Sequence, residues 1–218
     1  MLKKTKIKKP LKLFSKDNVI KQFVLTQRQS DKIDKYIQEI NIYNAHTNIV
    51  GKSTLIDPWK SHILDSLQIG SFIHNKNSTI LDMGTGAGIP GLILAINNFT
   101  NVSLVDSNLK KIKFIKSVCL KLNIETKIYH QRIESLINLN TKFDYLVSRA
   151  LANLNKLFYY SQKLLNNNTV LIFLKGGHVK DEIKEASKHW SFHHQVHQSI
   201  SDERGSVIII RSLNSING

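Results

Sequence analysis

A glycine-rich turn between two apolar stretches constrains the fold of this chain more than any other feature. The stretch reads TILDMGTGAGIPGLILAI and runs from Thr79 to Ile96. Its first residues have the length and composition of a buried strand, and its last residues have those of an apolar helix. Closely spaced glycines between a strand and a helix are typical of α/β folds, in which the turn lies against a bound ligand. The residues around the turn must therefore indicate which ligand it holds.

Short apolar runs alternate with helical patterns from Thr79 onward, which predicts a mostly parallel sheet wrapped by helices. Two further strand-like runs, FHHQVHQSI and GSVIIIRSL, flank the turn SDERG and predict a closing antiparallel hairpin. We expect the other strands at 79–83, 102–106, 126–130, 143–148 and 169–174, with helices near 89–97, 108–121, 151–165 and 178–189.

Composition divides the chain into three parts. We predict a basic flexible tail over 1–24, a helical N-terminal extension over 25–70 and the main domain over 71–218. In the extension, apolar residues of TQRQSDKIDKYIQEINIY recur at intervals of three or four, which predicts an amphipathic helix. The stretch DPWKSHILDSLQIG predicts a second helix, with Asp57 as its N-cap and Gly70 at its end.

The tail is strongly basic. The net charge of the chain is +15, and its first seven lysines all precede the first acidic residue, Asp17. Clustered lysines bind nucleic acids because they release counterions from the phosphates. Lys is also enriched by the composition of an AT-rich genome, so charge alone leaves RNA binding by the tail open. The candidate RNA-binding residues are Lys3, Lys4, Lys6, Lys8, Lys9 and, after the fifth predicted parallel strand, Lys175.

Composition also excludes several classes of protein. The single cysteine, Cys119, cannot form a disulfide within the chain, and its helical position indicates a buried structural thiol. No apolar run approaches the roughly 20 residues that a membrane-spanning helix needs. The basic N-terminus is not followed by the apolar segment of a signal peptide. We therefore expect a cytoplasmic protein without membrane contact.

Two ligand-binding templates fit the glycines. Gly86, Gly88 and Gly91 match G-x-G-x-x-G, the pattern of a nicotinamide-binding turn. Alternatively, Asp82 and Gly84 begin the pattern D-x-G-x-G-x-G, which continues through Gly86 and Gly88. A phosphate-binding Walker loop is excluded, because no lysine follows the last glycine.

Asp82 favours the second template, because a carboxylate at the end of the strand would repel a pyrophosphate. S-adenosyl-L-methionine (SAM) has no phosphate and carries a positive sulfonium and a positive ammonium. We therefore predict SAM as the cofactor, with Asp106 at the end of the second strand accepting hydrogen bonds from the ribose. The predicted fold class is α/β: a Rossmann-like methyltransferase sheet with a closing antiparallel hairpin and a helical N-terminal extension.

Other strand ends supply the remaining candidate site residues, because open α/β sheets bind ligands at the carboxyl ends of their strands. Ile133 and Glu134 follow the third strand and are expected near the adenine. Arg149 ends the fourth strand at the expected switch point. A NAD-linked oxidoreductase and a non-catalytic basic RNA-binding module stay open as alternatives.

Two further clusters of polar residues do not predict chemistry of their own. His193, His194 and His197 alternate between the two faces of a strand without a thiol nearby, so we expect no metal site. The helical spacing of the three residues His62, Asp65 and Ser66 places them side by side. We expect this trio to anchor its helix or to contact the substrate.

Several segments occur together in a known order: NIVGKSTLIDPWKSHILDSLQI, ILDMGTGAGIPGLILAI, VDSNLKKIKFIKS, RIES, FDYLVSRALANL and FLKGG. With these, residues 25–212 resemble the RsmG (GidB) family of bacterial 16S ribosomal RNA guanine-N7 methyltransferases. The resemblance implies a 16S rRNA substrate within the small ribosomal subunit, and no metal. It also implies SAM contacts at Gly84, Ile89, Ile133, Glu134 and Arg149.

The resemblance agrees with the catalytic groups that the sequence offers. Guanine N7 carries a free lone pair and loses no proton on methylation, so no general base is needed. Rate acceleration then comes from holding the reacting atoms in line. Arg149 is the candidate catalytic residue, and its predicted role is positioning.

Overall fold

The structure is a computed structural model and describes residues 15–139 and 141–216. The predicted RNA contacts Lys3, Lys4, Lys6, Lys8 and Lys9 lie outside these residues. The N-terminal part consists of α1 (Lys16–Gln22), α2 (Gln27–Asn44), the 3-10 helix η1 (Lys52–Leu55), the π-helix η2 (Trp59–Leu64) and α3 (Asp65–Gly70).

The rest of the chain alternates strands and helices, as predicted. Its elements are β1 (Thr79–Met83), α4 (Gly91–Ile96), β2 (Asn101–Asp106), α5 (Leu109–Leu122), β3 (Lys127–His130), η3 (Ile133–Leu139), β4 (Tyr145–Arg149), α6 (Leu154–Ser161), η4 (Gln162–Leu164), β5 (Val170–Lys175), α7 (Val179–Ala186), β6 (Trp190–Gln198) and β7 (Ser206–Ser215).

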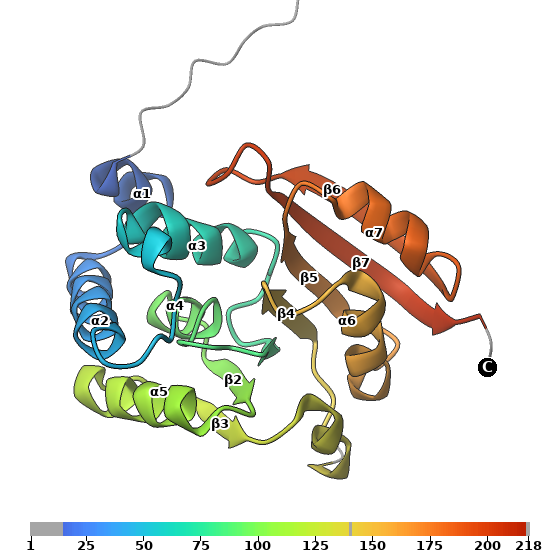
Figure 1. The fold of residues 1–218 in the computed structure, drawn as a ribbon, viewed down its shortest axis with the longest axis horizontal. Coiled ribbons are helices and arrows are strands. Elements are labelled where there is room, and N and C mark those ends of the chain that lie inside the picture. Colours follow the sequence, from blue (N-terminus) through green and yellow to red (C-terminus); the bar gives the residue numbers. More distant parts are fainter. Residues whose placement is uncertain (1–14, 140, 217–218) are drawn as a thin grey trace, which may run out of the picture.

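The strands form one sheet in the order β3-β2-β1-β4-β5-β7-β6 (Figure 1). The strands β1 to β5 are parallel, and β7 pairs antiparallel with both β5 and β6. The predicted parallel sheet and closing hairpin are therefore confirmed. Because β2 and β4 lie on opposite sides of β1, the switch point of the sheet lies between β1 and β4.

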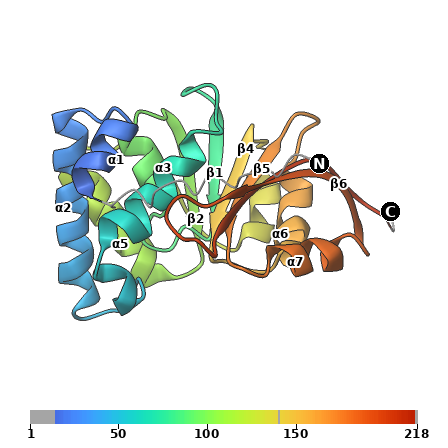
Figure 2. The ribbon, with the colours of Figure 1, turned by 90° about the horizontal axis from the view of Figure 1, so that it is seen from above.

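Alternate residues of each strand enter two separate hydrophobic cores. In β1, Ile80 belongs to the core beneath α2, α3, α4 and α5, whereas Leu81 belongs to the core beneath α6 and α7. In Figure 2, α1, α2, α3 and α5 gather at one end of the molecule, and α6 and α7 gather at the other. Both faces of the sheet are covered, so its crevice at the strand ends is the natural place for a ligand.

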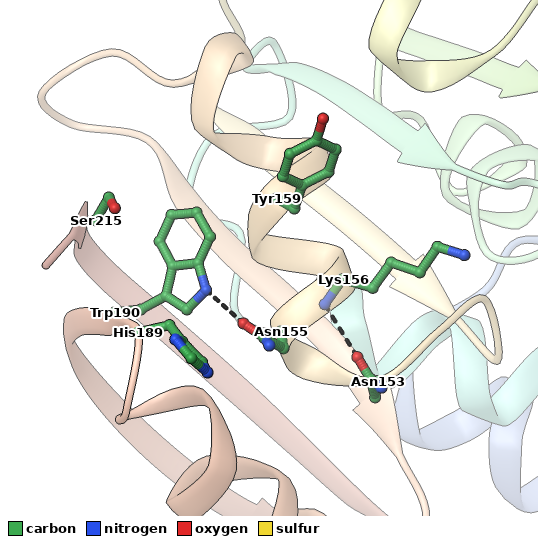
Figure 3. A pocket seen from close by; sticks show the side chains of 7 residues that line it. All are labelled: Asn153, Asn155, Lys156, Tyr159, His189, Trp190 and Ser215. Atoms are coloured by element: carbon green, nitrogen blue, oxygen red, sulfur yellow. Dashed lines mark hydrogen bonds between the residues drawn. The ribbon is translucent and has the colours of Figure 1, made fainter. Parts of the chain in front are cut away.

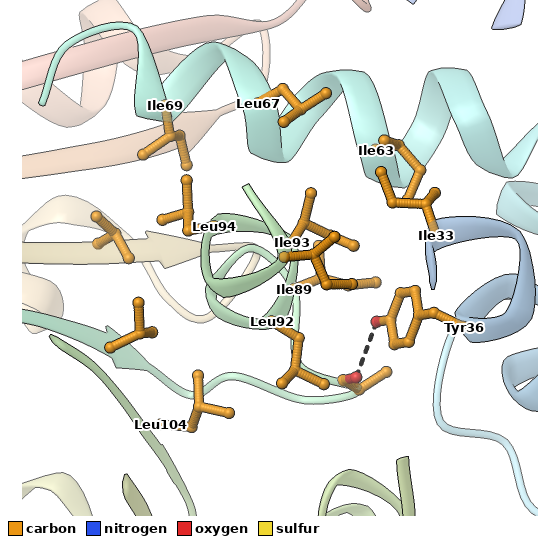
Figure 4. Packing of buried hydrophobic residues seen from close by; sticks show 14 of the residues in the cluster. Ile33, Tyr36, Ile63, Leu67, Ile69, Ile89, Leu92, Ile93, Leu94 and Leu104 are labelled. Atoms are coloured by element: carbon orange, nitrogen blue, oxygen red, sulfur yellow. Dashed lines mark hydrogen bonds between the residues drawn. The ribbon is translucent and has the colours of Figure 1, made fainter. Parts of the chain in front are cut away.

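The N-terminal extension is part of the first core. Ile33 and Tyr36 of α2, Ile63 of η2 and Leu67 of α3 are fully buried around α4 (Figure 4). Burial of one such aliphatic side chain contributes about 1.5–3 kcal/mol. The extension therefore stabilises the helix that follows the glycine turn.

Side chains cap two helix starts, one of which, at Asp57, was predicted. Thr26 and Gln29 form a reciprocal capping box at the start of α2. The carboxylate of Asp57 accepts a hydrogen bond from the backbone N–H of Lys60, at 3.1 Å. The expected continuous α-helix over 58–70 instead begins with the π-helical turn of η2, which no signal in the sequence indicated.

Within residues 15–139 and 141–216, every helix is too short or too polar to cross a bilayer. In the same part of the chain, no three His, Cys, Asp or Glu side chains gather as metal ligands do. Cys119 is a buried free thiol, as predicted.

Candidate functional site

The glycine turn lies at the carboxyl end of β1, beside the switch point. Gly84, Gly86 and Gly88 all adopt positive φ angles, of +67°, +61° and +96°. Side chains rarely tolerate this conformation. A Cβ on Gly84 would lie 2.5 Å from Leu151, whereas a Cβ on Gly86 would meet no atom closer than 3.9 Å. The side of the turn at Gly86 is therefore open.

Asp82 lies beneath this turn and is fully buried. Its Oδ2 accepts hydrogen bonds from the Thr85 hydroxyl and from the Gly91 N–H, the latter at 2.8 Å. Its Oδ1 is buried without a hydrogen-bond partner. Burial raises the pKa of Asp82 to about 7, although the bonds from Thr85 and Gly91 oppose the rise. Asp82 thus shapes the turn and keeps one acceptor atom unused.

Asp106 connects the end of β2 to the same turn. Its carboxylate accepts the N–H of Gly86 at 3.0 Å and the N–H of Asn108 at 2.8 Å. The ammonium of Lys111 lies 3.9 Å from it. The side chain is therefore fixed at the strand end where the sequence placed a ribose contact.

The residues predicted near the adenine follow β3 at the edge next to Asp106, since His130 of β3 pairs with Asp106 of β2. Ile133 is buried and Glu134 is exposed, at the start of η3. Between these elements, the Nε2 atom of Gln131 is buried without a hydrogen-bond partner.

Arg149, at the end of β4, is held by two members of the predicted trio. Its Nε lies 3.1 Å from Asp65 Oδ2, and its Nη1 lies 2.8 Å from His62 Nδ1. Ser66, the third member, donates a hydrogen bond to the carbonyl oxygen of His62 in its own helix. His62 and Asp65 therefore anchor the extension to the carboxyl end of β4 through Arg149.

The protonation state of His62 follows from this contact. Burial and the neighbouring charge of Arg149 lower the pKa of His62 to about 3, so its ring is neutral. A guanidinium can only donate, so His62 Nδ1 accepts and the ring proton is on Nε2. Nε2 is itself buried without a hydrogen-bond partner. Arg149 is thus fixed by one neutral and one acidic side chain.

The turn between β6 and β7 hydrogen-bonds to Asp65 on the side away from Arg149. Ser201 donates a hydrogen bond to Asp65 Oδ1, and Gln68 Nε2 lies 3.0 Å from the same oxygen. Gln68 Oε1 also accepts the backbone N–H of Ile200 at 3.1 Å. Sequence reasoning missed these partners, because Ser201 and Ile200 lie more than a hundred positions from the helix that they contact.

Lys175, a predicted RNA contact, has internal partners instead. Its ammonium lies 2.6 Å from the carboxylate of Glu182 and 2.7 Å from the carbonyl oxygen of Ala152. Glu182 also accepts the backbone N–H of Leu154 at 2.8 Å. The pair therefore holds the segment between β4 and α6, and a phosphate would have to displace Glu182 to bind this lysine.

Three buried side-chain polar atoms lack a hydrogen-bond partner in the described part of the chain: His62 Nε2, Asp82 Oδ1 and Gln131 Nε2. Such atoms cost about 1–3 kcal/mol each when nothing satisfies them. All three lie near the carboxyl edge of the sheet. Asp82 is in β1, Gln131 follows β3, and His62 contacts Arg149 at the end of β4.

Comparison of the whole fold with solved structures supports the fold class. The chain is similar to a ribosomal protein L11 methylase from Lactobacillus delbrueckii, with a TM-score of 0.54 and 20% identity, over 67% of this chain and 75% of that one. It is also similar to a TehB-like SAM-dependent methyltransferase from Corynebacterium glutamicum, with a TM-score of 0.52 and 14% identity, over 67% of this chain and 86% of that one. The fold is therefore that of SAM-dependent methyltransferases.

Sequence comparison is more specific. The chain is 36% identical to the ribosomal RNA small subunit methyltransferase G of Rickettsia prowazekii over 186 residues, which are 85% of this chain and 95% of that protein. It is 33% identical to the protein of the same name from Orientia tsutsugamushi (strain Boryong), over 83% of this chain and 89% of that protein. The family model of rRNA small subunit methyltransferase G matches residues 29–212. This chain therefore belongs to the rRNA small subunit methyltransferase G (GidB) family.

Proposed function

We propose that this protein transfers a methyl group from SAM to N7 of a guanine in 16S rRNA, within the small ribosomal subunit. The observation that carries the proposal is the fixed guanidinium of Arg149 beside the glycine turn, in a chain of this family. The charge of Arg149 also acts on the buried carboxylate, since it lowers the pKa of Asp82 against the effect of burial. The pairing of β1 with β4 also supports assigning the glycine turn and Arg149 to one site.

The residues at this edge fit SAM. The unpartnered Oδ1 of Asp82 is an acceptor that suits a positively charged ligand, and the open side of Gly86 leaves room beside the turn. Asp106 would bind the ribose, as a fixed carboxylate at a strand end does in Rossmann folds. The residues that we propose to hold the cofactor are Asp82, Gly84, Gly86, Gly88, Ile89, Asp106, Ile133, Glu134 and Arg149.

When bound, SAM supplies an electrophilic methyl group, which the lone pair of N7 accepts without any proton transfer. The protein therefore needs no general base, and its own contribution is position. His62 and Asp65 take up Nη1 and Nε of Arg149, which leaves Nη2 for the cofactor or the target base. Because the guanidinium of Arg149 is planar and its direction is fixed, it can align one of these ligands with the other.

Calorimetry and RNA mapping test the proposal. We expect the purified protein to bind SAM and not NADH, and N7-methylguanosine to disappear from one position of 16S rRNA when the gene is deleted. Restoring the wild-type gene should return the modification, and a gene carrying Arg149→Lys should not. Binding of NADH in place of SAM would support the oxidoreductase, and unchanged N7-methylation after deletion would refute the rRNA assignment.

A further inference from the structure

A second pocket lies away from the glycine turn, between α6 and the starting end of β6 (Figure 3). Its volume is about 430 Å³, within the range of small-molecule and nucleotide sites. Asn153, Asn155, Lys156 and Tyr159 line it from the α6 side. None of these residues belongs to the cofactor site described above.

The floor of this pocket is formed by a buried, hydrogen-bonded tryptophan. Trp190 is buried, and its indole N–H donates to Asn155 Oδ1 at 2.6 Å. The Trp190 ring also meets the edge of Phe158, with 5.9 Å between the ring centroids. Asn155 Oδ1 accepts this bond, and the amide N–H₂ of the same side chain is a donor that it can offer a ligand.

The rim of the pocket carries a cation and an exposed aromatic ring. Tyr159 is 59% exposed although it stands on a helix whose other face is buried. The Lys156 ammonium lies 5.7 Å from the centroid of the Tyr160 ring, on the same helix. The lining includes no carboxylate. An exposed aromatic face, a lysine and amide donors are the groups that bind a nucleobase together with its phosphate.

One end of the pocket, at Asn153, is close to Arg149 along the chain. Asn153, the N-cap of α6, follows Arg149 by four positions. Four residues span at most about 14 Å even when fully extended. Tyr159 stands six residues, or about 9 Å, farther along α6. An RNA strand that carries a base to Arg149 can therefore reach the pocket with a nucleotide a few positions away.

We propose that this pocket binds a nucleotide of the substrate RNA that flanks the target guanine. The base stacks on Tyr159, and the phosphate pairs with Lys156. This inference rests on the proposed function, because it assumes that RNA reaches Arg149. It adds a contact that selects the RNA without taking part in methyl transfer.

Steady-state methyl transfer to small ribosomal subunits tests the pocket. Loss of one stacking contact in Tyr159→Ala is expected to raise KM for the subunits by about tenfold. We expect kcat and SAM affinity to stay at the wild-type values, and Tyr159→Trp to restore KM. Lys156→Ala should also raise KM, whereas Lys180→Ala, which removes an exposed lysine of α7 outside the pocket, should not.

Binding to protein-free 16S rRNA completes the test. Affinity for this RNA should fall in Tyr159→Ala and Lys156→Ala alike. If KM on subunits rises while affinity for free RNA is unchanged, the pocket binds a ribosomal protein and the inference is wrong. A wild-type KM in Tyr159→Ala overturns the inference alone. Absence of methyl transfer in the wild-type protein overturns the proposed function, and the inference with it.

Discussion

Arg149 depends for its position on two residues from another part of the chain. A largely buried guanidinium is costly unless partners take up its N–H groups. His62 accepts from it as a neutral ring, and Asp65 balances its charge, so the donors of Arg149 are divided between fixed partners and a ligand. Burial raises the pKa of Asp65, and Arg149 opposes this rise. Each of the three side chains thus maintains the state of the others.

We predict that Arg149→Lys retains the fold but loses about 100-fold in single-turnover methyl transfer, the order of loss expected from misplaced reacting groups. A lysine keeps the charge beside Asp65 but cannot satisfy His62 and a ligand in one plane. Single-turnover rates on small ribosomal subunits, measured beside melting temperatures, check this. A near-normal rate in the lysine variant would mean that Arg149 supplies charge alone.

Arg149→Ala makes a useful comparison, because it leaves Asp65 buried without its cation. Removing one partner of a buried ion pair costs about 3–5 kcal/mol, so this variant should lose thermal stability as well as activity. The lysine variant therefore separates geometry from stability better than the alanine variant does.

The raised pKa of Asp82 predicts that the stability of the protein depends on pH. Its pKa rises to about 7 from an ordinary value of 3.8, so the folded state holds this proton more tightly than the unfolded state does. Stability from this group is fully present below about pH 4 and is lost as pH rises to about 7. His62 acts in the opposite direction, since its pKa falls from 6.5 to about 3.

Asp82→Asn isolates this contribution, because His62 is the same in both proteins. The amide oxygen can still accept from Thr85 and Gly91, and the variant has no charge to bury. We expect the melting temperature of the variant to increase relative to that of the wild type as pH rises from 4 to 7. Above pH 8 the difference between the two should be constant. Parallel melting curves across this range, recorded without SAM, would show that Asp82 does not titrate there.

At the scale of elements, the glycine turn is fixed by packing at one position and by backbone conformation at another. A Cβ on Gly91 would lie 2.2 Å from Leu104 and 2.8 Å from Asp82 Oδ2, with no positive φ at this residue. Gly86 has the opposite character, with a φ of +61° and no atom closer than 3.9 Å to an added Cβ. The same substitution should therefore act differently at the two sites.

We predict that Gly91→Ala lowers stability by about 1–3 kcal/mol, as overpacking does. Gly86→Ala should lower stability by about 1–2 kcal/mol through backbone strain, but should weaken SAM binding far more, because its methyl group enters the open side of the turn. Denaturant unfolding and SAM calorimetry on both variants check the contrast. Equal effects on SAM affinity would remove Gly86 from the cofactor site.

The sequence predicted most elements because their signals are local. The strand β5 begins with five consecutive apolar residues, and β1 and β2 are short segments with three apolar residues each. The partners of Arg149 were only grouped by helical spacing, and their target was not foreseen. A contact such as that of Ser201 with Asp65 depends on how the hairpin folds back, which no short segment encodes.

Lys175 is a second case in which the sequence did not indicate the partner of a predicted site residue. A lysine at a strand end indicates phosphate binding when only the sequence is read. In the folded chain, the carboxylate of Glu182, in the helix α7 that follows β5, lies 2.6 Å from the Lys175 ammonium and neutralises its charge. Whether a basic residue is available to RNA is decided by its acidic neighbours in space, and these come from elements that the sequence alone does not place together.

At the scale of the whole molecule, the charge of +15 favours a polyanionic partner, and the N-terminal lysines are the largest contribution from one segment. The structure indicates where that segment can be removed. Ser15 caps α1 through a hydrogen bond from the N–H of Asn18, at 3.2 Å, and Lys16 pairs with Asp34 of α2. Deletion of residues 1–14 retains both contacts, so α1 keeps its start.

We predict that this deletion lowers RNA affinity and its salt dependence while SAM affinity stays unchanged. Six lysines leave with the segment, and each phosphate contact on single-stranded RNA contributes about 0.7 to the slope of log K against log salt. The slope should therefore fall by up to about 4. Binding of 16S rRNA at several salt concentrations measures it, with a shuffled tail of the same composition as the control. A shuffled tail that restores the slope shows that charge alone acts, and a slope unaffected by the deletion shows that these lysines do not touch the RNA.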